Sequence, residues 1–147
     1  MKVISAIFLL LLLNACAAPQ YRQLSLDRTA LPPTANIDEV PFYPQDDHYC
    51  GPASLAMVLN WAGMPVSQQQ AAEQIYTPGR EGTLPADMLA GARRNGVLAV
   101  QVNTLQDLLS EVAAGHPVLV FQNLGLSFFP RWHYAVVKAY DLNNDTV

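Results

Sequence analysis

One cysteine stands at the junction between a polar segment and a run with helical periodicity. Cys50 is followed by Gly51 and Pro52, and apolar residues then recur three and four positions apart at Leu55, Val58, Leu59 and Ala62. The dipole and the free N–H groups of a helix N-terminus favour the thiolate, which is the nucleophilic form of cysteine. Gly51 has no side chain to shield the sulfur, and proline is tolerated in a first helical turn. The pattern therefore predicts an exposed reactive thiol, although it also suits an ordinary helix start.

A histidine and a glutamine have the side chains that would complete such a site. His133 opens a strand-like run, where an imidazole could take the proton of the thiol and return it to a leaving amine. Gln45 precedes Cys50 by five residues, so a loop could bring its amide beside the sulfur, where it would stabilise an oxyanion. His48 and His116 are the competing bases, and we rank both below His133.

The first residues have the layout of a signal peptide. Lys2 precedes an apolar run over residues 6–13, and small residues follow up to Cys16. The run is too short to span a bilayer, because a transmembrane helix takes about 20 apolar residues. The tetrad Leu13-Asn14-Ala15-Cys16 resembles the bacterial lipobox, whose cysteine receives a diacylglyceryl group and becomes the new N-terminus. We therefore expect residues 1–15 to be removed and Cys16 to be lipidated.

This lipid anchor predicts a location on the periplasmic face of a bacterial outer membrane. Ala17 is not the aspartate-type signal that retains lipoproteins at the inner membrane. Cleavage by an ordinary signal peptidase, which would give a soluble periplasmic protein, is the alternative. Once Cys16 is lipidated, Cys50 has no disulfide partner in an oxidising compartment. Such an unpaired exported cysteine is either reactive or an inert, buried apolar residue.

Charge and ligand spacing exclude other classes of function. Without residues 1–15 the chain has seven Lys and Arg against twelve Asp and Glu, so nothing in its charge attracts nucleic acid. Two cysteines far apart and three scattered histidines give no metal-ligand spacing. We therefore expect no metal or other cofactor and no nucleic-acid partner.

Periodicity and turn residues predict the elements that would position these side chains. Residues 16–39 are polar and contain several prolines, which is typical of a flexible tether, so one domain is expected over 40–147. In it we expect helices from Cys50 to about Trp61, from after Ser67 to Ile75, from Ala86 to Arg94 and from Leu105 to Ala114, strands at Val97–Val102, Pro117–Phe121 and Trp132–Tyr140, and a hairpin turn over 141–145. A helix would thus carry Cys50, and a strand would carry His133.

Four motifs in this order resemble the papain-like cysteine peptidases of family thirty-nine. They are Gln45, Tyr49-Cys50-Gly51-Pro52-Ala53, Ala114-Gly115-His116-Pro117-Val118-Leu119-Val120 and His133-Tyr134-Ala135-Val136-Val137. The family comprises the bacteriocin-processing peptidases that cut after a double-glycine leader, together with their stand-alone relatives. A papain-like cell-wall amidase would more often have Ser-Gly after the cysteine. The resemblance covers about residues 40–145.

The resemblance implies an α+β, papain-like fold in which a helical half carries the cysteine and an antiparallel sheet carries the histidine. It implies Cys50 as nucleophile, His133 as general acid and base, and Gln45 as oxyanion donor, in a reaction through an acyl-enzyme. The sequence shows no P-loop pattern and no transmembrane bundle, so it is similar to the stand-alone members.

One residue of the family pattern is missing from this chain. The family orients its histidine with an Asp or Asn on the strand after the hairpin. If Asn143 and Asn144 form the centre of a tight turn, the residue opposite His133 would be about number 154, beyond Val147. Asp141 stands eight residues along the same strand, about 26 Å away at roughly 3.3 Å per residue, and cannot replace it. We therefore expect a fold that is incomplete at the C-terminus and lacks the strand that would cover the edge of Tyr134–Tyr140.

Two functions follow from this pattern. The first is a cysteine peptidase that acts on a peptide or protein substrate in the bacterial envelope, by hydrolysis or by acyl transfer to an amine. The alternative is a catalytically weak or inactive module of the same fold that binds a peptide or protein partner at the outer membrane. The missing orienting residue favours the alternative, although its loss lowers activity by orders of magnitude rather than abolishing it. The aromatic segment Phe128–Trp132 could line the groove of such a module.

Overall fold

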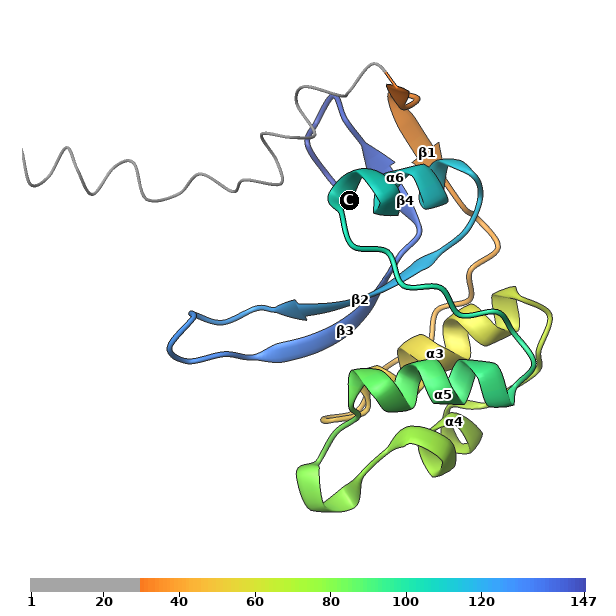
Figure 1. Ribbon diagram of the computed structural model, residues 1–147, viewed down its shortest axis with the longest axis vertical. Coiled ribbons are helices and arrows are strands. Elements are labelled where there is room, and N and C mark those ends of the chain that lie inside the picture. Colours follow the sequence, from red (N-terminus) through yellow and green to blue (C-terminus); the bar gives the residue numbers. More distant parts are fainter. Residues whose placement is uncertain (1–29) are drawn as a thin grey trace, which may run out of the picture.

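The computed structural model describes residues 30–147 (Figure 1). Its elements are β1 (Thr34–Asn36), α3 (Cys50–Trp61), α4 (Gln68–Ile75), the 3-10 helix η2 (Pro78–Arg80), α5 (Pro85–Arg94), α6 (Leu105–Ala113), β2 (Val118–Asn123), β3 (Trp132–Val137) and β4 (Ala139–Asp141). The predicted signal peptide over 1–15, the lipidation of Cys16 and the tether up to residue 29 lie outside the described residues. None of the helices within 30–147 is long and apolar enough to cross a membrane.

Helices α3 to α6 form where the periodicity and the capping residues predict them. Ser67 Oγ accepts a hydrogen bond from the Gln70 N–H at 3.1 Å, and the Gln70 side chain accepts one from the Ser67 N–H at 2.9 Å. This is the predicted capping box of α4. At the start of α6, Thr104 Oγ1 accepts from the Asp107 N–H at 3.0 Å. Such caps satisfy N–H groups that have no partner inside the helix, so these two helix starts are set by local sequence.

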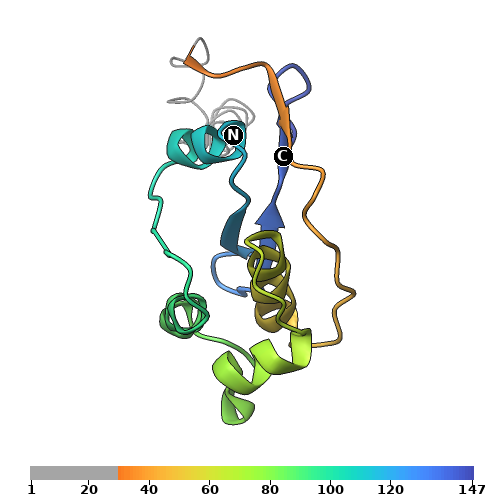
Figure 2. The ribbon, with the colours of Figure 1, turned by 90° about the vertical axis from the view of Figure 1, so that its right-hand side faces the viewer.

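Helix α3 lies between two apolar clusters and contributes buried residues to both. In the first cluster, α3 packs against α6 and against the segments around β1 and β4. Its buried residues are Ile37, Val40, Ala53, Met57, Leu109, Val112, Tyr140 and Leu142. The second joins it to α4, α5 and β3 through Leu55, Ala56, Leu59, Ala71, Ile75, Met88, Ala92 and Tyr134. Figure 1 shows α3, α4 and α5 at one end of the molecule and α6, β1 and β4 at the other, and Figure 2 shows α3 beside the β2–β3 hairpin. Packing on both sides holds the start of α3, where Cys50 stands, in a fixed place.

The strands form two antiparallel pairs. In the β2–β3 pair, His133 lies opposite Gln122. The single strand predicted over Trp132–Tyr140 is interrupted at Lys138, whose carbonyl accepts a hydrogen bond from the Ile37 N–H at 2.9 Å. Beyond the interruption, β4 pairs with β1. The residues on both sides of Lys138 are apolar and β-prone, so the pattern of the sequence alone does not reveal this change of partner.

The prediction that residues 16–39 form a flexible tether is wrong for the end of that segment. Residues 34–36 form β1, and Ile37 is buried in the first apolar cluster. The hydrogen-bonding groups of a strand edge favour a pairing partner, and β1 supplies it to β4. Composition predicted a tether here because the prolines precede the three-residue strand directly. The fold therefore begins before residue 40.

The strand predicted at Val97–Val102 is also wrong, because the segment has no regular secondary structure. Val97 and Ala99 pack against the second apolar cluster, whereas Leu98 and Val100 are 90% and 71% exposed. This alternation is the one expected of a strand with one buried face. Within residues 30–147, however, no other strand pairs with the segment, and pairing is what makes an extended chain a strand.

Candidate active site

Cys50 is the first residue of α3, and backbone N–H groups without a partner lie at this helix start. The Tyr49 N–H donates to the Asp46 carbonyl at 3.1 Å, and the Tyr49 ring stacks on Tyr76 with centroids 5.1 Å apart, which fixes the turn before the helix. No side chain caps this helix. Among the described residues, the N–H groups of Cys50 and Gly51 have no hydrogen-bond partner. Cys50 is half-buried and Gly51 is buried, so the Cys50 N–H is the one of the two that can donate to the oxygen of a bound ligand.

A cavity of about 480 Å³ brings the three predicted catalytic residues together. Gln45, Cys50 and His133 all line it, although 88 positions separate the first from the last. The loop before α3 forms one wall, and the loop between α4 and α5 forms another. The β2–β3 hairpin closes it with Phe121, Trp132 and Tyr134. Gln45 is exposed, whereas Cys50 and His133 are half-buried.

The aromatic wall of this cavity is formed by stacked rings from both strands of the hairpin. The Phe121 ring lies 4.8 Å from that of Trp132 and 4.5 Å from that of Tyr134, centroid to centroid. Stacked cross-strand aromatic pairs stabilise a hairpin and limit the motion of its side chains. Of the aromatic segment Phe128–Trp132, only Trp132 lines the cavity. Phe128 and Phe129 are exposed to solvent and do not line it. The prediction that the segment lines a groove therefore holds at this cavity for Trp132 and not for the two phenylalanines.

The three histidines occupy different environments. His133 lines the cavity, and its ring makes no hydrogen bond within residues 30–147. His48 also lines the cavity, with its Nε2 3.9 Å from Glu81 Oε2 on the exposed rim. His116 lies outside it, where its Nδ1 is 2.8 Å from Glu111 Oε2 and its ring meets Trp61 edge-on. His133 and His48 are thus the two histidines that line the cavity with Cys50, and His116 lies outside it.

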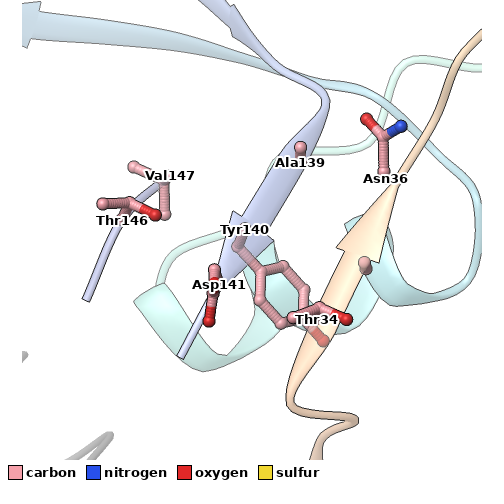
Figure 3. Close-up of a pocket in the computed structure, with 8 residues that line it drawn as sticks. Thr34, Asn36, Ala139, Tyr140, Asp141, Thr146 and Val147 are labelled. Carbon is pink, nitrogen blue, oxygen red and sulfur yellow. The ribbon is translucent and has the colours of Figure 1, made fainter. Parts of the chain in front are cut away.

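A second cavity, of about 390 Å³, lies between β1, β4 and the C-terminal turn (Figure 3). Asp141 in its lining accepts hydrogen bonds from the Asn144 side chain at 2.7 Å and from the Asn143 N–H at 2.8 Å. These bonds, that of the Asn144 side chain first, lower the pKa of Asp141. They confirm the predicted hairpin turn, which is closed by the pairing of Asp141 with Thr146. Asp141 therefore stabilises a turn and does not orient His133, and the lining contains no cysteine or histidine.

The loop over residues 80–83 is a part of the site that the sequence analysis missed. The Tyr134 hydroxyl donates to the Thr83 carbonyl at 3.2 Å, which holds this loop against β3. Thr83 also packs on the backbone of Gly51, the residue after the candidate nucleophile. The turn residues Pro78 and Gly79 did predict a break in the helix here. Nothing local, however, showed that the loop would fold onto the start of α3.

Gly51→Ala is expected to lower the free energy of unfolding by about 1–3 kcal/mol. A Cβ at position 51 would lie 2.7 Å from Thr83 Oγ1 and 2.8 Å from Thr83 Cβ, which is closer than side chains approach. Urea unfolding measures the change. Because the clash is with the Thr83 side chain, Thr83→Gly in the same chain should restore part of the loss. Equal stability of wild type and Gly51→Ala would contradict the close packing of this loop.

Burial chiefly, with the charges of Cys50 and Asp87, raises the pKa of Tyr134 to about 12. The unfolded value is near 10, so this group stabilises the fold fully below about pH 10, and the contribution is lost as the pH rises toward about 12. We expect the free energy of unfolding to fall by about 1 kcal/mol between about pH 9 and about pH 11 on account of Tyr134. Urea unfolding of Tyr134→Phe should show a correspondingly smaller fall.

The matched control for that measurement is Tyr76→Phe. It also removes a hydroxyl from a half-buried tyrosine, but Tyr76 takes no part in the hydrogen bond to Thr83. It should keep the alkaline loss of the wild type. If Tyr134→Phe and Tyr76→Phe lose stability equally between the two pH values, Tyr134 is not the group responsible.

The sequence profile of the Peptidase_C39 like family matches residues 37–147. Comparison with curated protein sequences and with solved structures finds no match. The fold agrees with the expected papain-like α+β arrangement, with Cys50 at the start of a helix and His133 on an antiparallel strand. The match spans most of the chain and includes Gln45, Cys50 and His133. This chain therefore belongs to the Peptidase_C39 like family.

Proposed function

We propose that this protein is a cysteine peptidase that cleaves peptide bonds through an acyl-enzyme on Cys50. The observation that carries the proposal is the cavity lined by a thiol, an imidazole and a side-chain amide, namely Cys50, His133 and Gln45. Family membership supports the class of peptidase. The wall formed by Phe121 and Trp132 would contact the substrate beside the thiol.

In the proposed reaction, His133 accepts the proton of the Cys50 thiol, and the sulfur attacks the carbonyl carbon of the peptide bond. The carbonyl oxygen becomes an oxyanion, to which the Cys50 N–H and the Gln45 side-chain NH₂ donate hydrogen bonds. The C–N bond then breaks, and His133 gives its proton to the leaving amine. Water, deprotonated by His133, next attacks the thioester, which releases the carboxylic acid and regenerates the thiol. The reaction needs no cofactor.

Gln45→Ala is expected to lower kcat by about 10²–10³-fold with a smaller effect on KM, because an oxyanion donor acts mainly in the transition state. Steady-state hydrolysis of a cleaved peptide measures both constants. The control is Gln101→Ala, since Gln101 is an exposed glutamine between α5 and α6 that does not line the cavity. A kcat for Gln45→Ala equal to that of the control would show that Gln45 makes no contact with the oxyanion.

A second candidate is a peptide-binding module with little turnover. The observation that favours it is that the ring of His133 makes no hydrogen bond that would orient it within residues 30–147. An unoriented imidazole spends less time in the tautomer and direction that the reaction needs. The same cavity would then hold a peptide or protein partner without cleaving it.

We further propose that Cys16 is lipidated and holds the protein at the periplasmic face of the bacterial outer membrane. The support for this is the lipobox-like tetrad and the short apolar run before it. A soluble periplasmic protein is the alternative. In either location the substrate would be a peptide or protein of the cell envelope, and neither nucleic acid nor a metal takes part.

The experiment that tests the function exposes a mixture of peptides from a bacterial envelope proteome to the purified full chain. Mass spectrometry then detects new peptide ends. A peptidase produces ends that are absent with Cys50→Ser, whereas a binding module retains intact peptides equally well in both forms. If neither new ends nor retained peptides are found, both proposals are wrong.

A further inference from the structure

The loop at the end of the β2–β3 hairpin carries a continuous group of exposed apolar side chains. In Figure 1 this hairpin extends away from helices α3 to α6. The exposed residues, with their exposed fractions, are Leu124 (64%), Leu126 (60%), Phe128 (80%), Phe129 (75%) and Trp132 (57%). Single exposed apolar residues are common on soluble proteins, but a contiguous group marks an interaction surface.

Hydrogen bonds within this loop satisfy four of its backbone N–H groups, whereas those of Leu126, Ser127 and Phe128 have no partner among the described residues. Asn123 Oδ1 accepts from the Gly125 N–H at 2.9 Å and from the Arg131 N–H at 2.8 Å. The Leu124 N–H donates to the Arg131 carbonyl at 2.8 Å, and the Phe129 N–H donates to the Leu126 carbonyl at 3.0 Å. These bonds lower the cost of moving the four groups out of water, and the hydrated headgroup layer of a bilayer can supply partners to the rest.

The same turn directs the apolar side chains outward. A Cβ at Gly125 would lie 2.3 Å from the Phe129 carbonyl oxygen, so the two arms of the loop are in direct backbone contact. No room remains between them for side chains. The leucines and phenylalanines therefore cannot cover one another inside the loop, and they face the surroundings.

The charge pattern of the hairpin suits a phospholipid surface. No Asp or Glu occurs between residues 112 and 140, although the chain has twelve elsewhere, and residues 117–130 carry no charged side chain at all. The first charge after the tip is Arg131, followed directly by Trp132. Trp and Arg are typical of the membrane interface, where a ring or an aliphatic stem meets lipid and the polar end stays in water. Acidic side chains, which anionic headgroups repel, are absent from this element.

We propose that the loop over residues 124–132 inserts into the interface of a phospholipid bilayer. A projecting loop whose exposed side chains are almost all apolar suits a fluid layer, because lipid needs no matching shape and offers no specific polar partner. Phe121 and Trp132 belong to both the hairpin and the cavity wall. Insertion would therefore place the mouth of the cavity beside the membrane. This inference does not depend on peptidase activity or on lipidation of Cys16.

Fluorescence of Trp132 tests the proposal in the full chain. The sequence has two tryptophans, so Trp61→Phe leaves Trp132 as the only one. The chain is mixed with vesicles of phosphatidylethanolamine and phosphatidylglycerol, with and without bromine on the acyl chains. We expect a shift of the Trp132 emission to shorter wavelength and its quenching by the brominated lipid. This local signal reports on the loop even when the apolar N-terminal run binds the same vesicles.

Leu126→Asp in this background should abolish both the shift and the quenching, because it places a carboxylate in the inserted part of the loop. The matched control is Leu98→Asp, the same substitution at a leucine that is 90% exposed on the segment between α5 and α6. It should leave both signals unchanged.

Four results would overturn the proposal. The Trp132 emission could stay unchanged with vesicles. It could shift without vesicles as the protein concentration rises, which would indicate that the loop binds a second copy of the chain. It could shift only when a peptide is added, which would indicate that the loop binds the substrate and not the bilayer. Equal effects of Leu126→Asp and Leu98→Asp would also reject insertion of this loop.

Discussion

Replacing Cys50 with serine is expected to lower kcat/KM for peptide hydrolysis by about four orders of magnitude or more. A serine hydroxyl at the start of α3 would be a far weaker nucleophile than a thiolate, and the rest of the cavity would be unchanged. The substrate is a peptide found to be cleaved in the proteome-derived mixture. The measurement is the rate of appearance of its new N-terminus under conditions where the substrate is far below KM.

The matched control for Cys50→Ser is Cys16→Ser, the same substitution at the other cysteine of the chain. It should leave hydrolysis by the purified protein unchanged, because Cys16 lies before the family match at 37–147. Binding of the peptide should survive in Cys50→Ser, since the aromatic wall and Gln45 remain. If Cys50→Ser cleaves within about tenfold of the wild-type rate, Cys50 is not the nucleophile and the mechanism is wrong.

Replacing His133 with alanine is expected to slow the alkylation of Cys50 by iodoacetamide near neutral pH by about tenfold, and to lower kcat/KM by about 10²–10⁴-fold. The reason is that a proton acceptor beside the thiol raises the fraction of reactive thiolate, and the same imidazole must later protonate the leaving amine. The alkylation rate is measured in a Cys16→Ser chain, so that Cys50 is the single thiol. This measurement needs no substrate, and it therefore tests the pair even if the protein is a binding module.

Substitutions of the two other histidines show whether the effect on alkylation is specific to His133. His116 lies outside the cavity and against Glu111, so His116→Ala should leave the alkylation rate unchanged. His48 lines the cavity near Glu81 and is the remaining candidate base. A large loss with His48→Ala together with a wild-type rate for His133→Ala would transfer the role to His48. Equal and slow alkylation in all of these forms would mean that Cys50 is an inert thiol.

The sequence was a good guide to helices, because their signals are local. The capping box at Ser67 and the cap at Thr104 act within a single turn, and both occur where the residues predicted them. The same holds for the hairpin turn at Asn143 and Asn144, which Asp141 closes through hydrogen bonds to near neighbours. The three candidate site residues were predicted from their types and order; they line one cavity, and their catalytic roles stay a prediction.

Strand assignment was less accurate because a strand depends on a partner that can be far away in the sequence. Val97–Val102 has the alternation of a strand and remains an unpaired extended segment. Thr34–Asn36 has the composition of a linker and becomes a strand, because β4 offers it an edge more than a hundred residues later. The free energy of strand pairing outweighs the weak intrinsic secondary-structure preference of three residues.

The sequence by itself determined the helices, the thiol at a helix start and the identity of the residues that could act with it, because these depend on neighbours within a few positions. The tertiary structure alone decided which residues surround that thiol. The Tyr134 hydroxyl fastens Thr83, and Thr83 packs on Gly51, so three segments far apart in the chain meet beside Cys50. The stacking of Phe121 on Trp132 and the outward direction of the apolar loop beyond them were decided in the same way. Such contacts form only when distant segments pack together, and no local pattern of residues encodes which segments will meet.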